Sequence, residues 1–198
     1  MNDIDQSEVE EIIEDMSDLQ KVMVILFYSN SEEPIVGKTK FDKELKLQKE
    51  VFLISQNLSE IGKESSYDAD YYGPYSETVA EEFKGLALDE VVQDNQTSIR
   101  LLPLGKEIAK ELIKSYSKKI LDMVSDFKKL INNMSQEEIL TLIYTSFPDY
   151  TEESVVKEDV MRNRIKIAIQ LYKKGKISLE RTSEIAGLTL EKLMNEIG

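Results

Sequence analysis

The sequence predicts a mainly α-helical protein with a winged-helix-like N-terminal domain carrying a short β-hairpin, a long connecting helix and a C-terminal helix-turn-helix-like module. Over most of the chain, apolar residues recur every three or four positions, which is the helical period. The only strand-like apolar runs cover residues 88–92 and 99–102, and the turn formers Asp94 and Asn95 lie between them, as in a hairpin. Near the end, Gly187 separates two short helical segments.

The first helices of the chain are predicted from apolar spacing and from capping residues. Residues 1–17 form an acidic segment with helically spaced apolar positions, and Asp18 is the expected cap of a buried helix after it. Pro34 lies in the turn that follows. Thr39 then stands three residues before Asp42, which is a helix-start pattern, and the helix is expected to run to about Gln56.

The order of elements over residues 18–115 is that of a winged helix. An irregular connection is expected over residues 57–75. Ser76 is a good cap for a third helix, which should end near Gly85, and the hairpin comes next. In a DNA-reading winged helix the third helix enters the major groove. Here its charged side chains are mainly acidic: Glu77, Glu81 and Glu82 against Lys84. We expect this helix not to read DNA.

A single long helix is predicted over residues 104–134, and residues 116–150 are interpreted as a helical connector. The apolar residues of the long helix alternate at spacings of four and three. This is a heptad seam, which fits a homodimer. Leu112, Val124 and Ile131 broaden the seam, which also fits a helix packed within its own bundle. The protein-interface candidates on the seam are Ile113, Tyr116, Ile120, Met123, Phe127 and Leu130.

The C-terminal module is predicted over residues 151–198. A helix is expected from Ser135 to about Phe147, where Pro148 stops it, and another from Thr151 to Lys174. Ser178 and Thr189 are the expected caps of the two short helices at the end.

Composition excludes several classes of function. The 198 residues contain no cysteine and no histidine, so thiol nucleophiles, imidazole bases and the usual zinc ligands are absent. No carboxylate pair has a recognisable acid–base setting. The sequence therefore predicts no enzyme, no cofactor and no metal site. The lack of cysteine, of a signal peptide and of a membrane-length apolar run predicts a cytoplasmic protein without membrane contact.

Charge is unevenly distributed along the chain, whose formal net charge is −13. Residues 1–33 hold ten acids and one base, whereas residues 157–176 hold seven bases and two acids. Phosphate attraction needs local positive charge, so only the second segment is suited to duplex DNA.

Three segments in the N-terminal half carry a resemblance. They are Lys46–Leu53 (KLQKEVFL), Tyr72–Ser76 (YGPYS) and Leu101–Lys106 (LLPLGK). Together they resemble Panacea-type antitoxins and related winged-helix-like families, over about residues 18–115. The resemblance implies a helical domain with a small wing in a prokaryotic regulator whose partners are often proteins. Leu102-Pro103 departs from the Leu-Thr step that such proteins often have.

A second resemblance covers about residues 160–197. Ala168–Leu179 (AIQLYKKGKISL) and Thr182–Thr189 (TSEIAGLT) are similar to a family of small prokaryotic antitoxin-like proteins. It implies a helix-turn-helix module with DNA or a partner protein as ligand. Thr182 and Ser183 depart from the alanines common there. If DNA is the ligand, its candidate contacts are Arg162, Arg164, Lys166, Lys173, Lys174, Lys176, Lys192 and Asn195.

Two functions are favoured by the sequence, and an enzyme with an unrecognised carboxylate site is a weaker third alternative. The first is a non-catalytic, antitoxin-like or transcription-regulator-like protein that contacts duplex DNA through its C-terminal module. The alternative is an adaptor that binds a partner protein and makes no nucleic-acid contact.

Overall fold

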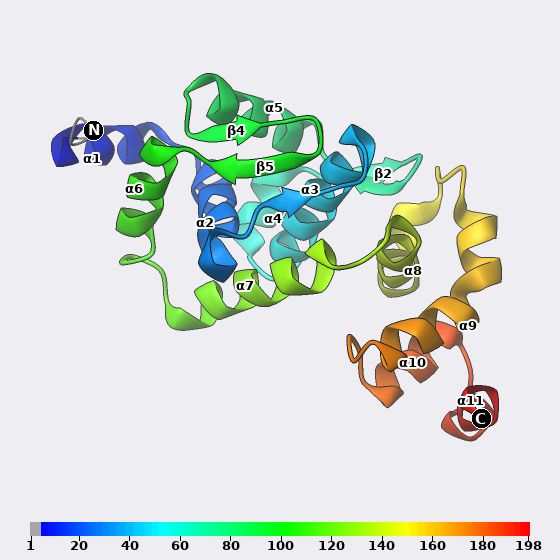
Figure 1. Ribbon diagram of the computed structural model, residues 1–198. Coiled ribbons are helices and arrows are strands. Elements are labelled where there is room, and N and C mark those ends of the chain that lie inside the picture. The colour runs from blue at the N-terminus through cyan, green and yellow to red at the C-terminus, as the bar shows by residue number, and fades with distance from the viewer. Residues whose placement is uncertain (1–4) are drawn as a thin grey trace. The chain divides into compact units, whose positions relative to one another are not determined.

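A computed structural model describes residues 5–198, so residues 1–4 of the predicted acidic segment lie outside the described residues. The chain is mainly helical, as predicted, with eleven α-helices and two small sheets in the described part (Figure 1). It divides into two units. Of the described residues, unit 1 comprises 5–67 and 76–133, and unit 2 comprises 68–75 and 134–198. This division differs from the predicted boundaries at residues 115 and 150.

Seven helices and one sheet build unit 1. The helices are α1 (Gln6–Asp15), α2 (Asp18–Glu32), α3 (Lys40–Ser55), α4 (Ser59–Ser65), α5 (Glu77–Leu88), α6 (Pro103–Leu112) and α7 (Lys118–Asn132). Thr39 and Ser76 cap α3 and α5 as predicted, each accepting a backbone N–H three residues on. The cap of α2 is Ser17 rather than Asp18, because Ser17 and Gln20 form a reciprocal capping box.

A hairpin is present in unit 1 near the predicted position, and it gains a third strand. Its first strand covers residues 92–94 instead of the predicted 88–92, so Asp94 lies in the strand rather than in the turn. β4 (Val92–Asp94) pairs antiparallel with β5 (Ser98–Leu101), with Val92 opposite Leu101. β1 (Ile35–Val36) pairs with the other edge of β5, with Ile35 opposite Ile99. The strand order is therefore β1-β5-β4, and the three strands lie side by side in Figure 1.

The predicted long helix over residues 104–134 is wrong. The chain forms α6 and α7 with a turn between them. Two serines explain the break: the Ser115 hydroxyl donates to the carbonyl of Leu112, and the Ser117 side chain caps α7. The heptad seam therefore does not run along one helix. Both helices pack on α2, which lies between them in Figure 1.

The connection predicted to be irregular over residues 57–75 is also more ordered than expected. It forms α4, β2 (Asp68–Asp70) and β3 (Gly73–Tyr75), and the two strands pair antiparallel. α5 continues past Gly85 to Leu88, because glycine weakens a helix without necessarily ending it.

Unit 2 holds the hairpin β2–β3 and the last helices: α8 (Gln136–Ser146), the 3₁₀ turn η1 (Pro148–Thr151), α9 (Lys157–Lys173), α10 (Leu179–Ala186) and α11 (Leu190–Ile197). α9 begins six residues later than the predicted start at Thr151, since η1 occupies residues 148–151. Ser135, Ser178 and Thr189 cap their helices as predicted.

Each unit has its own buried apolar side chains. In unit 1 they come mainly from α2, whose residues Val22–Phe27 are all buried, and from α3, α5, α6 and the sheet. In unit 2 they include Ile139, Ile143, Ile167, Leu171 and Leu193. Within the described residues, each helix is too short or too polar to cross a lipid bilayer.

Candidate functional site

The helices α10 and α11 are joined by a three-residue turn that begins at Gly187. Gly187 has φ 67° and ψ 34°, a left-handed conformation that suits glycine. Thr189 then starts α11 by accepting the backbone N–H of Lys192. Two short helices joined in this way make the arrangement in which a DNA-binding module places its reading helix second. The position of that second helix is taken by α11.

The cations predicted to contact DNA differ in what surrounds them. Arg162, Lys166 and Lys173 are exposed on α9, and Arg162 pairs with Asp159 at 2.9 Å. Lys174 pairs at 2.6 Å with Glu138, whose side chain is only 3% exposed. Lys174 is therefore a structural cation, although its own side chain stays half exposed.

The remaining candidates lie close to the turn and on α11. The half-buried Arg164 covers Gly187: a Cβ added to that glycine would lie 2.6 Å from Arg164 Nη2. Lys176 follows α9 and is half-buried, whereas Lys192 and Asn195 are exposed on α11. The structure thus brings Arg164 of α9 to the α10–α11 turn.

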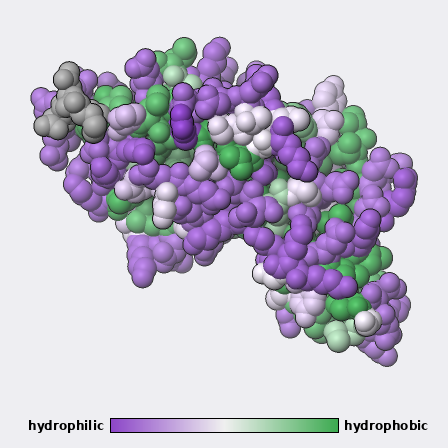
Figure 2. Space-filling view, in the orientation of Figure 1, coloured by the Kyte–Doolittle hydropathy of each residue, from purple (hydrophilic) through white to green (hydrophobic). Residues whose placement is uncertain are grey.

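The outer surface of α11 is apolar and acidic rather than basic. Leu190 and Met194, four residues apart and so on one helix face, are 45% and 54% exposed. Leu193 of the same apolar stripe is fully buried. The charged side chains of α11 are Glu191, Lys192 and Glu196, and all three are exposed. The space-filling view shows apolar side chains reaching the surface of unit 2 (Figure 2).

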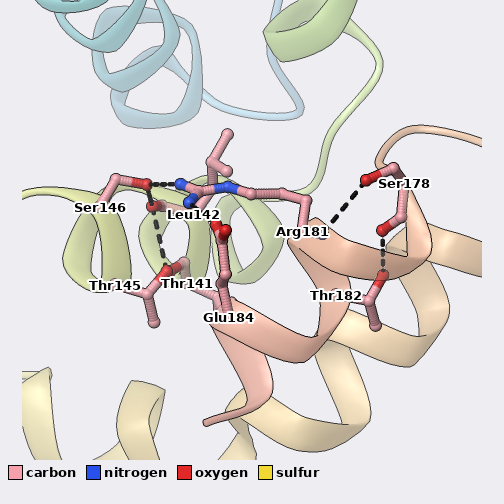
Figure 3. A network of polar contacts seen from close by, with 8 residues as sticks. All are labelled: Thr141, Leu142, Thr145, Ser146, Ser178, Arg181, Thr182 and Glu184. Carbon is pink, nitrogen blue, oxygen red and sulfur yellow. Dashed lines mark hydrogen bonds and ion pairs between the residues drawn. The ribbon is translucent and has the colours of Figure 1, made fainter. Parts of the chain in front are cut away.

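Sequence reasoning missed Arg181, which fixes α10 to α8. Its guanidinium pairs with Glu184 at 2.6 Å and also donates to the hydroxyl of Ser146 (Figure 3). Ser146 in turn donates to the carbonyl of Leu142 at 2.5 Å, in the last turn of α8. The sequence shows an arginine in the first turn of α10, but it does not show its partner Ser146, which lies 35 residues away. Arg181 therefore links α10 to the end of α8.

Unit 1 contains a cluster of buried charged residues: Lys46 and Glu50, from the segment Lys46–Leu53 that carries the first resemblance, and Lys128 of α7. Lys46 Nζ donates to the carbonyls of Val36 and Asn132 at 2.7 and 2.8 Å. Lys128 Nζ donates to the carbonyls of Phe27 and Ser29, each at 3.0 Å. These lysines bind backbone carbonyls near the ends of α2, β1 and α7.

Glu50 lies in this cluster, fully buried, and neither of its carboxyl oxygens has a hydrogen-bond partner. Burial raises the pKa of Glu50 well above its ordinary value, although the nearby charges of Lys128 and Lys46 act in the opposite direction. Burial likewise lowers the pKa of Lys128 to about 8, with Glu50 opposing the change. Glu50 is therefore harder to ionise in the folded protein than an exposed glutamate is.

The interface candidates of the predicted seam lie in unit 1. Tyr116, Ile120, Met123 and Phe127 are half-buried and pack against the buried core of that unit. Ile113 caps the end of α6, and Leu130 is half-buried on α7. The predicted homodimer remains a prediction. Most of its proposed contact residues already have partners within their own unit.

Residues 5–198 contain no group of three or more acidic side chains arranged to hold a metal ion. No protein-family model, no curated protein and no solved structure matches this chain. The two resemblances carried by the sequence motifs therefore remain predictions.

Proposed function

We propose that this chain is a non-catalytic, antitoxin-like regulatory protein whose C-terminal module binds a partner protein through α11. The observation that carries the proposal is the exposure of Leu190 and Met194 where a DNA-binding module would present its reading side chains. Base edges and phosphates are recognised by donors and cations, which these two side chains lack.

Unit 2 buries only part of the apolar stripe of α11. Leu193 is buried in the module, while Leu190 and Met194 continue the stripe into solvent. An amphipathic helix of this kind fits an apolar groove, as in helix-in-groove recognition. Glu191 and Glu196 beside the stripe favour a groove with a basic rim. The partner is therefore a protein with such a groove.

The topology of unit 1 supports a winged-helix-like N-terminal domain. α2, β1, α3, α5 and the β4–β5 hairpin follow one another in winged-helix order, and β1 completes the sheet beside β5. α4 and the β2–β3 hairpin are insertions between the second and third helices of that pattern. On α5, the third helix, Glu77 and Glu81 are exposed beside Lys84, so this surface repels phosphate.

Site-specific photo-crosslinking of the full chain tests the proposal. A photoreactive residue at position 194, in cells that make the protein, should give an adduct with one defined protein. The same residue at position 173 on α9 should give none. Leu190→Glu should remove the adduct, whereas Lys166→Glu should leave it unchanged, with circular dichroism confirming that both variants fold.

Contact with DNA is the second candidate, and the exposed Lys166 and Lys173 on α9 favour it. Binding of the full chain to random duplex DNA, measured by fluorescence anisotropy against salt, distinguishes the two functions. The protein-binding proposal expects no measurable affinity at physiological salt and no change with Lys166→Gln. Affinity that falls steeply with salt and weakens with Lys166→Gln, together with no adduct from position 194, would establish DNA contact instead.

A further inference from the structure

The last residues of α2, after a kink at Ser29, have a backbone conformation that is rare for residues other than glycine. Asn30, Ser31 and Glu32 all have positive φ, at 57°, 57° and 63°. A left-handed conformation costs a non-glycine residue free energy, and such residues normally occur singly. Three in succession persist only where the surrounding structure holds them, and such strained segments occur preferentially at functional sites.

The rest of unit 1 holds this left-handed turn, residues 30–32, in place. The Ser125 hydroxyl donates to Asn30 Oδ1 at 2.6 Å, and Asn30 Nδ2 donates to the Ser125 carbonyl at 3.4 Å. Lys128 binds the carbonyl of Ser29 just before the turn, and Lys106 pairs with Glu32 at 2.5 Å. Contacts from both α6 and α7 therefore fix the turn.

The left-handed turn forms one wall of a surface cavity of about 440 Å³. α2, the end of α6 and the first half of α7 supply the rest, and Figure 1 shows α2 between the other two helices. This volume lies within the range of small-molecule sites. Its main lining residues are Ile25, Tyr28, Ser31, Ile113, Leu121 and Asp122.

The chemistry of this cavity combines apolar surface with two carboxylates, of which Glu32 is paired with Lys106. Ile25, Ile113 and Leu121 supply the apolar wall, and Tyr28 adds aromatic surface. No lysine or arginine lines the cavity among the described residues. The Asp122 carboxylate makes no ion pair or hydrogen bond with any part of the chain that the structure describes. An ammonium group would neutralise it, and an aromatic ring nearby also attracts cations.

We propose that this cavity binds a small organic ammonium ion, with its apolar body against Ile25, Ile113 and Leu121 and its charge at Asp122. The held turn keeps the cavity open before binding, so that little ordering is required of the protein. This site is in unit 1 and does not depend on the function proposed for α11.

The test uses the full chain, 2-phenylethylammonium as the probe and phenylacetate as a probe of similar shape and opposite charge. Two-dimensional NMR should show shifts at the amides of Ser31, Leu121 and Ser125 with the ammonium ion alone. The dissociation constant should be on the order of 1 mM for so small a ligand.

Asp122→Asn should weaken the binding of the ammonium ion about three- to fivefold, which is the effect expected of an exposed charge pair. Asp126→Asn is the control, because it removes a carboxylate one turn further along α7 that does not line this cavity. Equal shifts with phenylacetate, an unchanged affinity in Asp122→Asn or no shift at 10-fold the expected dissociation constant, about 10 mM, would each overturn the proposal.

Discussion

Lys174 neutralises Glu138: its ammonium nitrogen lies 2.6 Å from the carboxylate Oε1, joining α9 to α8. The glutamate side chain is 3% exposed, while that of the lysine is 53% exposed. Burial raises the pKa of Glu138, but the hydrogen bonds from Lys174 and from the backbone N–H of Ser135 more than offset it. The pKa therefore lies below its ordinary value. A residue predicted to bind DNA phosphates thus serves the packing of unit 2.

Lys174→Gln should lower the free energy of unfolding by about 1–2 kcal/mol, because it removes the charge that neutralises a buried carboxylate. Lys173→Gln is the control. It removes an exposed neighbouring cation and should change the free energy of unfolding by less than about 0.5 kcal/mol. Urea unfolding at pH 7 measures both. A carboxyl group whose pKa is lowered in the folded state stabilises that state at pH values above 4.5, its ordinary pKa. This stabilisation is lost as the pH falls through the folded-state pKa. The free energies of unfolding of Lys174→Gln and of the unmutated protein should therefore become equal in acid.

Near pH 4.5 the Glu50→Gln variant should match the unmutated protein in free energy of unfolding, and it should become the more stable of the two as pH rises above 4.5. The pKa of Glu50 is raised above 4.5 by burial, so the folded state holds a proton that the unfolded state loses. Stability of the unmutated protein then falls with rising pH, and the neutral glutamine removes that fall. Urea unfolding between pH 4.5 and 7 checks this, below the range where Lys128 titrates. A glutamine variant that is less stable at pH 7 would mean that Glu50 is ionised and paired.

Helix starts were predictable because their causes are local. Thr39, Ser76, Ser135, Ser178 and Thr189 each stand before an apolar-periodic segment, and each accepts the backbone N–H three residues on. The β4–β5 hairpin was predicted in its place but not in its bounds, because Asp94, expected in the turn, is paired with Ile99 in the sheet.

What the sequence did not reveal depends on contacts between distant residues. The apolar spacing continues through Ser115 and Ser117, so nothing in its period shows that α6 ends there and that both helices pack on α2. Lys46 and Lys128 bind carbonyls on other elements, which no local pattern indicates. On the candidate site, the basic residues were visible in the sequence. Only the structure shows that Lys174 is paired with Glu138 and that Leu190 is exposed.

Two helical glycines in unit 1 should respond in opposite ways to alanine. At Gly105 an added Cβ would lie 2.2 Å from the backbone carbonyl oxygen of Val91, which cannot move without disturbing β4. Gly105→Ala should therefore lower the melting temperature, at a cost of about 2 kcal/mol or more. At Gly85 the nearest atom is the side-chain nitrogen of Gln20 at 3.4 Å, so Gly85→Ala should stabilise by about 0.5–1 kcal/mol. Thermal unfolding of both variants measures the contrast, and a stabilised Gly105→Ala would contradict the close packing of α6 against Val91.

The strain of the left-handed turn can be measured by replacing its residues with glycine. Ser31 has φ 57°, and its hydroxyl makes no hydrogen bond within the described residues. Ser31→Gly should therefore stabilise the protein by about 0.5–1 kcal/mol, since relief of about 1–2 kcal/mol of strain exceeds the added entropy of the unfolded chain. Asn30→Gly relieves similar strain but loses both hydrogen bonds to Ser125, so it should be neutral or destabilising. Urea unfolding of the two variants compares them directly. Stabilisation by Asn30→Gly equal to that by Ser31→Gly would show that Ser125 does not hold the turn. Destabilisation by Ser31→Gly would show that the turn is not strained.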